Sequence, residues 1–119
     1  MIRIKLFDAV EKPLVVYNAQ AMLNYAIDFY TEACDGDFVE NQEDFTLPDY
    51  ASSYFRIYNE RLGRQIKNIA LSRSGSNLII NASVLDLTFD SNGNYFYEIG
   101  YVQTAGYEIA LMYGVLKVV

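Results

Sequence analysis

Residues 90–119, DSNGNYFYEIGYVQTAGYEIALMYGVLKVV, decide the fold of this chain. They begin with SNGN at positions 91–94, a run of residues that favour turns. From 95 to 103 the side chains then alternate with the two-residue period of a strand, in a sequence rich in β-favouring residues. Residues 104–106 are a short, glycine-containing connection, and the alternation resumes from 107 to 113. The stretch therefore predicts a β-hairpin.

A three-residue loop also predicts which residues of the hairpin oppose each other. One face is almost wholly apolar, and a slip of one residue would exchange the two faces, so burial of this face should set the register. Its predicted pairs are Gln103 with Tyr107, Tyr101 with Ile109, Ile99 with Leu111, and Tyr97 with Tyr113.

The other face of the hairpin is expected to lie outside the core. Gly114 should break or bend the second strand before residues 115–119 end the chain in extended form. The predicted pairs on this face are Val102 with Glu108, Gly100 with Ala110, and Glu98 with Met112. Because an isolated apolar hairpin is marginal in water, the rest of the chain should supply a second layer.

Length and composition indicate one soluble domain that is not secreted by a cleaved leader. The chain has 119 residues, enough for a core without metal or disulfide support. A single cysteine, Cys34, excludes an internal disulfide and fits a reducing cytoplasm. No window reaches the roughly 18 apolar residues that span a bilayer, and residues 1–12 lack a signal-peptide core. We expect N-terminal strands and an acidic loop over 1–48, and the sandwich core over 49–119.

The charge is acidic and unevenly distributed. Fifteen acids against nine bases give a net charge of -6, which argues against general nucleic-acid binding. Between Lys12 and Arg56 there are eight acids and no base, whereas five of the nine bases lie within positions 56–73. Two interpretations stay open: two solvated faces, or a head-to-tail contact in which the acidic surface of one copy meets the basic surface of the next.

The remaining chain contains short strands separated by turn signals about every 8 to 12 residues, which is typical of a sandwich or barrel. Residues 19–33 fit either a helical stripe or a strand, and we favour a strand because 25–31 are aromatic and β-branched. Residues 35–49 are acidic and loop-like. Strands are expected at 1–8, 14–17, 53–59, 65–71, 78–80 and 84–89, with a Ser/Gly turn at 72–77.

Residues 90–97, DSNGNYFY, resemble the turn and strand of immunoglobulin-like sandwiches, in which a tyrosine two places before a cysteine forms the tyrosine corner. Tyr95 would be the corner residue, and Tyr97 stands where the cysteine would be. The missing cysteine removes the inter-sheet disulfide and the case for an antibody-type domain. The predicted fold is therefore all-β, an immunoglobulin-like antiparallel β-sandwich, with one short helix near residues 19–33 as the open alternative.

The pattern from Phe45 to the end also resembles the N-terminal sandwich domain of bacteriophage upper-baseplate and related virion fibre proteins. The matching features are FTLPDY, the strand YFRIYNERLGRQI, the stretch SGSNLIINASVLDLTFDSNGNYFYEIGY, a glycine turn and the closing YGVLKVV. The resemblance covers roughly the last 75 residues and lies in strands and turns. It implies a virion component that is assembled in the cytoplasm of a host bacterium, and it carries over no individual docking residue.

The residue inventory argues against an enzyme, a metal site or a cofactor. The chain has no histidine, which removes the commonest general base and metal ligand, and Cys34 therefore has no histidine partner. In the predicted register Glu98 and Glu108 lie roughly 13 Å apart, too far for a glycosidase pair. Residues 90–101 lack the glycine and glutamate of a calcium loop, and the acids at 35–40 have no defining spacing.

We therefore expect a non-enzymatic structural component of a phage particle, either a capsid decoration or head fibre or a tail or baseplate adaptor. It would act through contacts with other virion proteins, it would self-associate, and it would bind neither nucleic acid nor membrane. The candidate surfaces are the non-core hairpin face (Glu98, Val102, Glu108, Met112), the aromatic-basic strand (Tyr54, Arg56, Tyr58) and the acidic loop at 35–49.

The alternative is a carbohydrate-binding module that uses exposed tyrosines as sugar platforms. Such platforms need a coplanar row of exposed rings, which Tyr54 and Tyr58 could supply from one strand face. The absence of tryptophan counts against this alternative. Saturable binding to one class of glycan would favour it.

Overall fold

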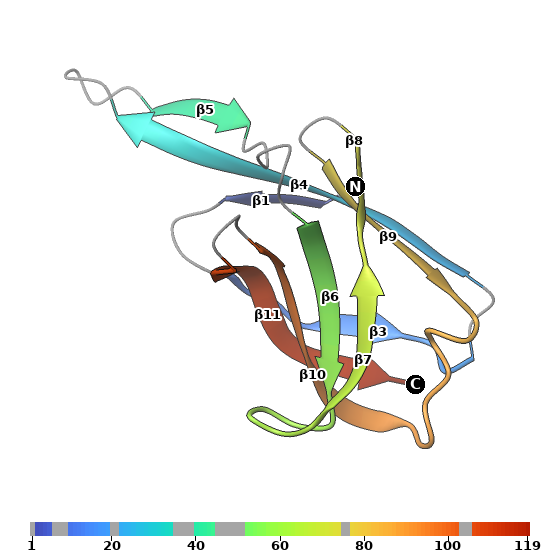
Figure 1. Ribbon diagram of the computed structural model, residues 1–119. Helices are drawn as coiled ribbons and strands as arrows, with labels where there is room; N and C mark the ends of the chain where they lie inside the picture. Colours follow the sequence, from blue (N-terminus) through green and yellow to red (C-terminus); the bar gives the residue numbers. More distant parts are fainter. Residues whose placement is uncertain are drawn as a thin grey trace.

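A computed structural model describes residues 2–5, 10–19, 22–34, 40–44, 52–74, 77–102 and 106–119. These residues form two β-sheets and no helix, so the all-β prediction is confirmed (Figure 1). Within them, no helix is long and apolar enough to cross a membrane. The five-stranded sheet has the order β1-β4-β9-β8, with β5 also paired to β4. Its strands are β1 (Ile2–Lys5), β4 (Met22–Cys34), β5 (Glu40–Asp44), β8 (Ser72–Ser74) and β9 (Asn77–Ser83).

The six-stranded sheet has the order β2-β11-β10-β6-β7, with β3 also paired to β11. Its strands are β2 (Val10–Glu11), β3 (Leu14–Val16), β6 (Ser52–Tyr58), β7 (Gln65–Ala70), β10 (Gly93–Val102) and β11 (Glu108–Val118). The expected antiparallel pairing holds for β6, β7, β10 and β11, but β2 and β3 run parallel to β11, and β1 runs parallel to β4. Both sheets are therefore mixed: parallel N-terminal strands join the antiparallel pairs of the predicted sandwich.

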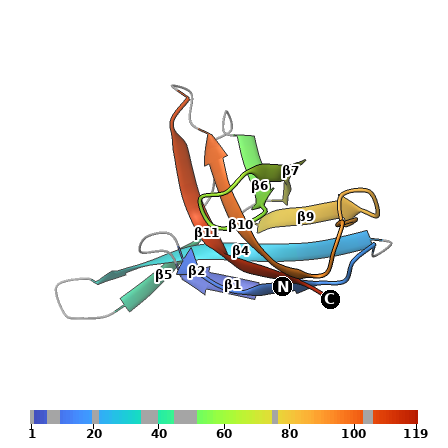
Figure 2. The same cartoon turned by 90° about the horizontal axis from the view of Figure 1, so that it is seen from below.

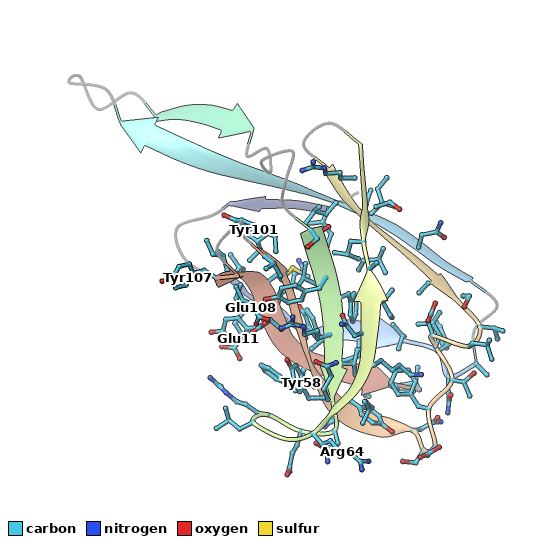
Figure 3. All side chains as sticks on the ribbon, viewed as in Figure 1. Glu11, Tyr58, Arg64, Tyr101, Tyr107 and Glu108 are labelled. Carbon is cyan, nitrogen blue, oxygen red and sulfur yellow. The ribbon has the colours of Figure 1, made fainter. Side chains whose placement is uncertain are left out.

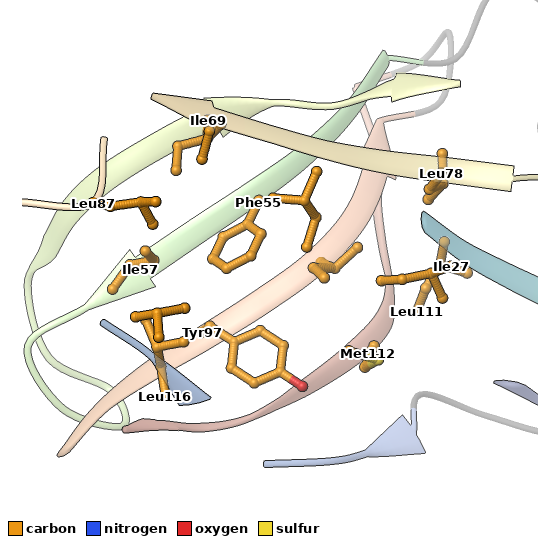
Figure 4. Close-up of a cluster of buried hydrophobic side chains, with 14 of the residues drawn as sticks. Ile27, Phe55, Ile57, Ile69, Leu78, Leu87, Tyr97, Leu111, Met112 and Leu116 are labelled. Atoms are coloured by element: carbon orange, nitrogen blue, oxygen red, sulfur yellow. The ribbon is translucent and has the colours of Figure 1, made fainter. Parts of the chain in front are cut away.

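The core lies between the two sheets. The five-stranded sheet contributes Ile27 and Leu78, and the six-stranded sheet contributes Phe55 and Tyr97, whose ring centroids are 5.8 Å apart (Figure 4). These four side chains are at most 2% exposed. Burying large aromatic and aliphatic side chains from both layers is the main force that holds such a sandwich together.

The predicted hairpin is formed by β10 and β11, but the predicted register is right only near the loop. Tyr101 pairs with Ile109, Gly100 with Ala110 and Val102 with Glu108, as expected, while Gln103 lies outside the described residues. Between Ile99 and Gly100 the register shifts by one residue, as a β-bulge on β11 produces. Ile99 therefore pairs with Met112, Glu98 with Tyr113, and Tyr97 with Gly114, so the three predicted pairs beyond Gly100 are wrong.

The bulge changes which β11 side chains reach the core. Leu111 and Met112 are adjacent in the chain, yet they are only 3% and 0% exposed. Met112, predicted on the non-core face, is therefore a core residue. Strict alternation cannot predict this, because a bulge places an extra residue in one strand only.

Gly114 does not interrupt β11, which continues to Val118. Its φ is 152°, and a Cβ at this position would lie 2.6 Å from the carbonyl oxygen of Lys12. The Lys12 amide donates to the carbonyl of Tyr113 at 2.8 Å, and the buried Tyr97 hydroxyl donates to the carbonyl of Lys12. Glycine is thus needed here so that the N-terminal segment can run alongside β11 in close contact at Lys12.

Residues 22–34 form the long strand β4, so the strand prediction for 19–33 is confirmed over 22–33, where the helix alternative is wrong. Tyr30 of β4 pairs with Lys5 of β1 and also with Asp44 of β5, so β1 and β5 lie on opposite edges of β4.

The acidic segment predicted as a loop at 35–49 is not all loop, because Glu40–Asp44 forms the strand β5. Residues 35–39 and 45–49 lie outside the described residues. β5 and the end of β4 extend away from the sandwich as a hairpin (Figures 1 and 2).

The predicted strand at 84–89 is instead a turn. The Asp86 carboxylate accepts hydrogen bonds from the amide and the hydroxyl of Ser83, both at 3.0 Å, and the Leu87 amide donates to the carbonyl of Ser83. Leu87 and Phe89 reach the core, while Leu85 is 80% exposed. An aspartate that accepts hydrogen bonds from backbone groups a few residues away favours a turn over a strand. Asp86 is such a residue, but the alternating apolar residues around it led to the strand prediction. The reverse occurs in the predicted turn at 72–77, where Ser72–Ser74 form the strand β8.

The hydrogen bond expected of a corner tyrosine is present. The Tyr95 hydroxyl donates to the carbonyl of Ser91 at 2.6 Å, four residues upstream. The Tyr95 ring also packs against Phe89, with centroids 4.9 Å apart. This contact ties the start of β10 to the loop before it.

Candidate interaction surface

The face of the six-stranded sheet that points away from the core, here called the outer face, brings two of the predicted surfaces together. Because β10 pairs with β6, Glu98 lies beside Arg56 and Gly100 beside Tyr54. On the other side of β10, Val102 pairs with Glu108 of β11. Figure 3 shows Tyr58 and Glu108 along this sheet. The aromatic-basic strand and the hairpin face were predicted as separate surfaces, but they form one.

Arg56 and Glu108 form the main polar contact of the outer face. The two terminal guanidinium nitrogens of Arg56 donate to the two carboxylate oxygens of Glu108 at 2.7 and 2.8 Å, which is the bidentate geometry that arginine favours. The hydrogen bond to Arg56 holds the pKa of Glu108 below its ordinary value, and the same bond raises the pKa of Arg56. The Arg56 side chain is 16% exposed and that of Glu108 49%.

Tyr54 lies beneath this ion pair. The Arg56 guanidinium carbon stands 3.8 Å from the centroid of the Tyr54 ring, and the Tyr54 hydroxyl donates to Glu98 at 2.8 Å. Burial, and then the hydrogen bond to Glu98, raise the pKa of the Tyr54 hydroxyl well above its ordinary value. Tyr54 is therefore a neutral hydrogen-bond donor at neutral pH, held in place by Arg56 above it and Glu98 beside it.

Gly100 makes room for the Tyr54 ring. A Cβ at position 100 would lie 2.6 Å from the Tyr54 hydroxyl and would collide with the backbone carbonyl of Ile109. A glycine opposite an aromatic residue in a neighbouring strand lets the ring lie across the backbone. The sequence offers this signal only once the β6–β10 pairing is known.

A strip of three half-buried rings continues the outer face beyond Arg56. Phe96 of β10 lies between Tyr58 of β6 and Tyr113 of β11, with ring centroids 6.2 and 6.1 Å away. Both ring pairs are tilted by 48°. The guanidinium of Arg61 lies 5.8 Å from the Phe96 centroid and 5.9 Å from that of Tyr113. We call Tyr58, Phe96 and Tyr113 the aromatic strip.

The sequence reasoning named only Tyr58 of this strip. Tyr113 was assigned to the apolar face of the hairpin, and the bulge moves it to the outer face opposite Glu98. Phe96 shares its face with Glu98 by simple alternation, so it was predictable in principle. Arg61 belongs to the β6–β7 turn, and only the fold brings it to the strip.

A shallow depression of about 270 Å³ lies next to Arg56 on the outer face. Val102 lies at its margin and is half-buried. The other lining residues come from β6 and β7 and are Ser52, Ser53, Tyr54, Arg56, Asn68 and Ala70. The depression is open, and its lining offers hydroxyl, amide and guanidinium groups to a partner beside apolar surface.

The remaining site predictions have different outcomes. Glu98 and Glu108 bind different partners, Tyr54 and Arg56, so they are not arranged as a carboxylate pair. Among the described residues, no group of three or more His, Cys, Asp or Glu side chains is placed to hold a metal ion. Side chains of the acidic segment 35–49 lie outside the description, so its role as a surface stays a prediction.

Comparison with known protein families and with curated proteins finds no match to this chain. The resemblance to phage baseplate and fibre domains is therefore a hypothesis that rests on the order of strands and turns in the sequence.

Proposed function

We propose that this chain is a non-enzymatic structural component of a phage particle, and that it docks on another virion protein through the outer face of its six-stranded sheet. The observation that supports docking is the continuity of this face. The aromatic strip adjoins the Arg56–Glu108 pair and the depression beside it. Tyrosine, phenylalanine and arginine are the residues enriched in the centres of protein interfaces.

The rings of the strip suit a protein partner. Each is half-buried, so its environment within this chain is already ordered, and little side-chain entropy would be lost when a partner covers it. Arg56, Glu98 and Glu108 surround the rings with groups that hydrogen-bond, as the polar rim of an interface does. The pairing of Arg56 with Glu108 also compensates the charges of these two groups on the face.

The carbohydrate-binding alternative has less support. Tyr54 is 5% exposed and is covered by Arg56, so it cannot stack on a sugar ring. The 48° tilts within the aromatic strip give no flat platform. Among the tyrosines whose side chains the structure describes, the freely exposed ones are Tyr17 and Tyr107, at 65% and 71%, and they lie apart in the chain, just after β3 and just before β11.

The immunoglobulin-like part of the proposal has one contact in its favour. The Tyr95 hydroxyl bond to the carbonyl of Ser91 is the bond that a tyrosine corner makes. The parallel strands β1, β2 and β3 are an N-terminal addition to the antiparallel hairpins of such a sandwich. We infer an immunoglobulin-like core that has been extended at its N-terminus.

The proposal is tested by particle assembly with and without this chain. Particles assembled without this chain should also lack any virion protein that docks on it. Added wild-type chain should restore both proteins to the particle. Tyr113→Asp should fail to incorporate, because it places a charge in the aromatic strip. Tyr107→Asp, the same change at a tyrosine outside the strip, should incorporate normally.

Two results would count against the proposal. Particles with a complete protein content in the absence of the chain would remove the structural role. Normal incorporation of folded Tyr113→Asp would show that the outer face is not the docking surface, whatever the role of the protein.

A further inference from the structure

The turn between β6 and β7 is an exposed, positively charged end of the molecule. It is closed by hydrogen bonds between Asn59 and Arg64: the Asn59 amide donates to the Arg64 carbonyl at 3.0 Å, and the Arg64 amide donates to the Asn59 side chain at 2.8 Å. Arg61 and Arg64 are both exposed, and neither forms an ion pair with a described residue. Figure 3 shows Arg64 at this end of the sheet.

Leu62 at the tip of this turn is an unusual residue for its position. It is 99% exposed, and its φ of 62° lies in the left-handed region, which disfavours residues with a side chain. Asparagine or glycine would fit this backbone better and would not expose apolar surface to water. Leu62 therefore presents apolar surface between Arg61 and Arg64, and a partner that covered it would remove this surface from water.

A groove of about 410 Å³ begins beside the turn and runs between β7 and residues 88–91. Arg64 and Lys67 line it, and Asp90 is its one acidic residue. Lys67 also donates to the carbonyl of Leu85 at 3.2 Å, which holds its ammonium group at the groove. With Arg61, the turn and groove present three cations against the acids Glu60 and Asp90. We call Arg61, Leu62, Arg64 and Lys67 the basic end.

The β4–β5 hairpin has the opposite character. Tyr30 to Cys34 of β4 pair with Asp44 to Glu40 of β5, and this pair of strands carries four acids and no base: Glu32, Glu40, Glu43 and Asp44. Figure 1 shows the hairpin at the upper left and the β6–β7 turn well apart from it at the bottom of the view, and the molecule measures 53 Å in its longest dimension. A contact between the two elements therefore has to join different copies.

We propose that copies of this chain associate head to tail, with the acidic β4–β5 hairpin of one copy lying against the basic end of the next. Opposite charges would bring the two elements together, and Leu62 would be buried in the contact. Because the two surfaces differ, the contact is heterologous and would build a ring or an open chain of copies. The inference concerns the chain alone and does not depend on the phage role, and the basic end shares only Arg61 with the outer face.

The test is the solution mass of the purified chain, measured by light scattering over about a hundredfold range of concentration at low and high salt. The mass should rise above the 13.6 kDa of one copy as concentration increases. Raising the salt from about 0.05 M to about 0.5 M should weaken association at least about tenfold, because the charges would then be screened. Leu62→Asn should weaken association at both salt concentrations.

Charge-reversal variants test whether the β6–β7 turn of one copy contacts the β4–β5 hairpin of another. A turn variant, Arg61→Glu with Arg64→Glu, and a hairpin variant, Glu40→Lys with Glu43→Lys, should each be monomeric, since each would bring like charges together. An equal mixture of the two variants should associate again, because the acidic turn of one then matches the basic hairpin of the other. Lys117→Glu, a reversal at an exposed residue of β11, is the control and should associate like the wild type.

Three results would overturn the inference. The first is a wild-type chain that stays monomeric over the whole range at low salt. The second is a pair of folded reversal variants that associate as the wild type does. The third is a mixture of the two variants that stays monomeric, which would show that these two elements do not meet.

Discussion

Arg56 of β6 and Glu108 of β11 are 52 positions apart in the chain, yet two hydrogen bonds of 2.7 and 2.8 Å join their side chains across β10. Between them runs Gly100, whose missing side chain leaves room for the Tyr54 ring. The contact ties three strands of the six-stranded sheet together on their outer face. It also covers Tyr54, one of the two tyrosines that the sequence offered as a sugar platform.

Removing Arg56 should destabilise the protein more than removing the charge of Glu108. Arg56→Ala loses the ion pair and the guanidinium over the Tyr54 ring, and we expect about 1 to 2 kcal/mol less stability in urea unfolding. Glu108→Gln keeps the cation over the ring. Because Glu108 is half exposed, its charge should contribute less than about 1 kcal/mol. Equal losses for both variants would contradict the role assigned to the ring contact.

Stability should depend on pH through Glu108. Its folded-state pKa is lowered from 4.5, mainly by the hydrogen bond from Arg56, so the carboxylate contributes stability above about pH 4.5 that is lost as the pH falls through the folded-state value. The difference in unfolding free energy between wild type and Glu108→Gln should therefore be largest at neutral pH and should shrink in acid. High salt should reduce it at every pH. A difference that grows in acid would refute this assignment.

Two tyrosine hydroxyls provide a matched comparison. Tyr97→Phe should cost about 1 to 2 kcal/mol, because it leaves the Lys12 carbonyl without its donor beside a fully buried ring. Tyr95→Phe removes a similar bond to the Ser91 carbonyl at an exposed site, where water can replace the hydroxyl, and should cost less than about 1 kcal/mol. Thermal unfolding of both variants gives the comparison. A larger loss for Tyr95→Phe would reverse our ranking of the two contacts.

Gly114→Ala should detach the N-terminal segment from β11. The new methyl group would lie 2.6 Å from the Lys12 carbonyl, on a backbone with a φ of 152°. We expect a loss of about 2 to 4 kcal/mol from strain and crowding. Hydrogen exchange should show reduced protection at β2 and β3 before the rest of the sheet. Ala110→Ser, a small change on the same strand and away from this contact, is the control.

Leu62→Asn should leave the fold intact. Asparagine tolerates the left-handed backbone better than leucine does, so stability should be unchanged or should rise by up to about 1 kcal/mol. Unfolding is measured at a concentration at which the chain is monomeric, which separates this effect from association. A loss of more than about 1 kcal/mol would mean that Leu62 has a packing role within its own copy.

Local patterns predicted most of the strands. The aromatic and β-branched residues of 25–31 correctly favoured the strand that became β4, and the alternation of β6 correctly separated Phe55 and Ile57 from Tyr54 and Arg56. The same reasoning failed at 84–89, where Asp86 forms a turn, and at Met112, where a bulge brings a second side chain into the core. In both places alternation was apparent in the sequence, but a backbone hydrogen bond or an extra residue decided the structure.

The candidate site was predictable as a set of residues but not as an arrangement. Tyr54, Arg56, Glu98 and Glu108 were all named, because alternation assigns each to a face of its own strand. That two strands far apart in sequence would lie side by side was not predictable. Phe96 was predictable from alternation, but its neighbours Tyr113 and Arg61 followed only from the bulge and the strand pairing.

The sequence by itself determined that this protein is all-β, because the two-residue period of its apolar side chains is a local property of each segment. It also determined that acidic and basic residues are segregated along the chain, since that depends on composition alone. Only the tertiary structure decided the strand order, the parallel docking of β1, β2 and β3, and the placement of Arg56 against Glu108. These features depend on burial and on hydrogen bonds between segments far apart in the chain, and no local pattern records them.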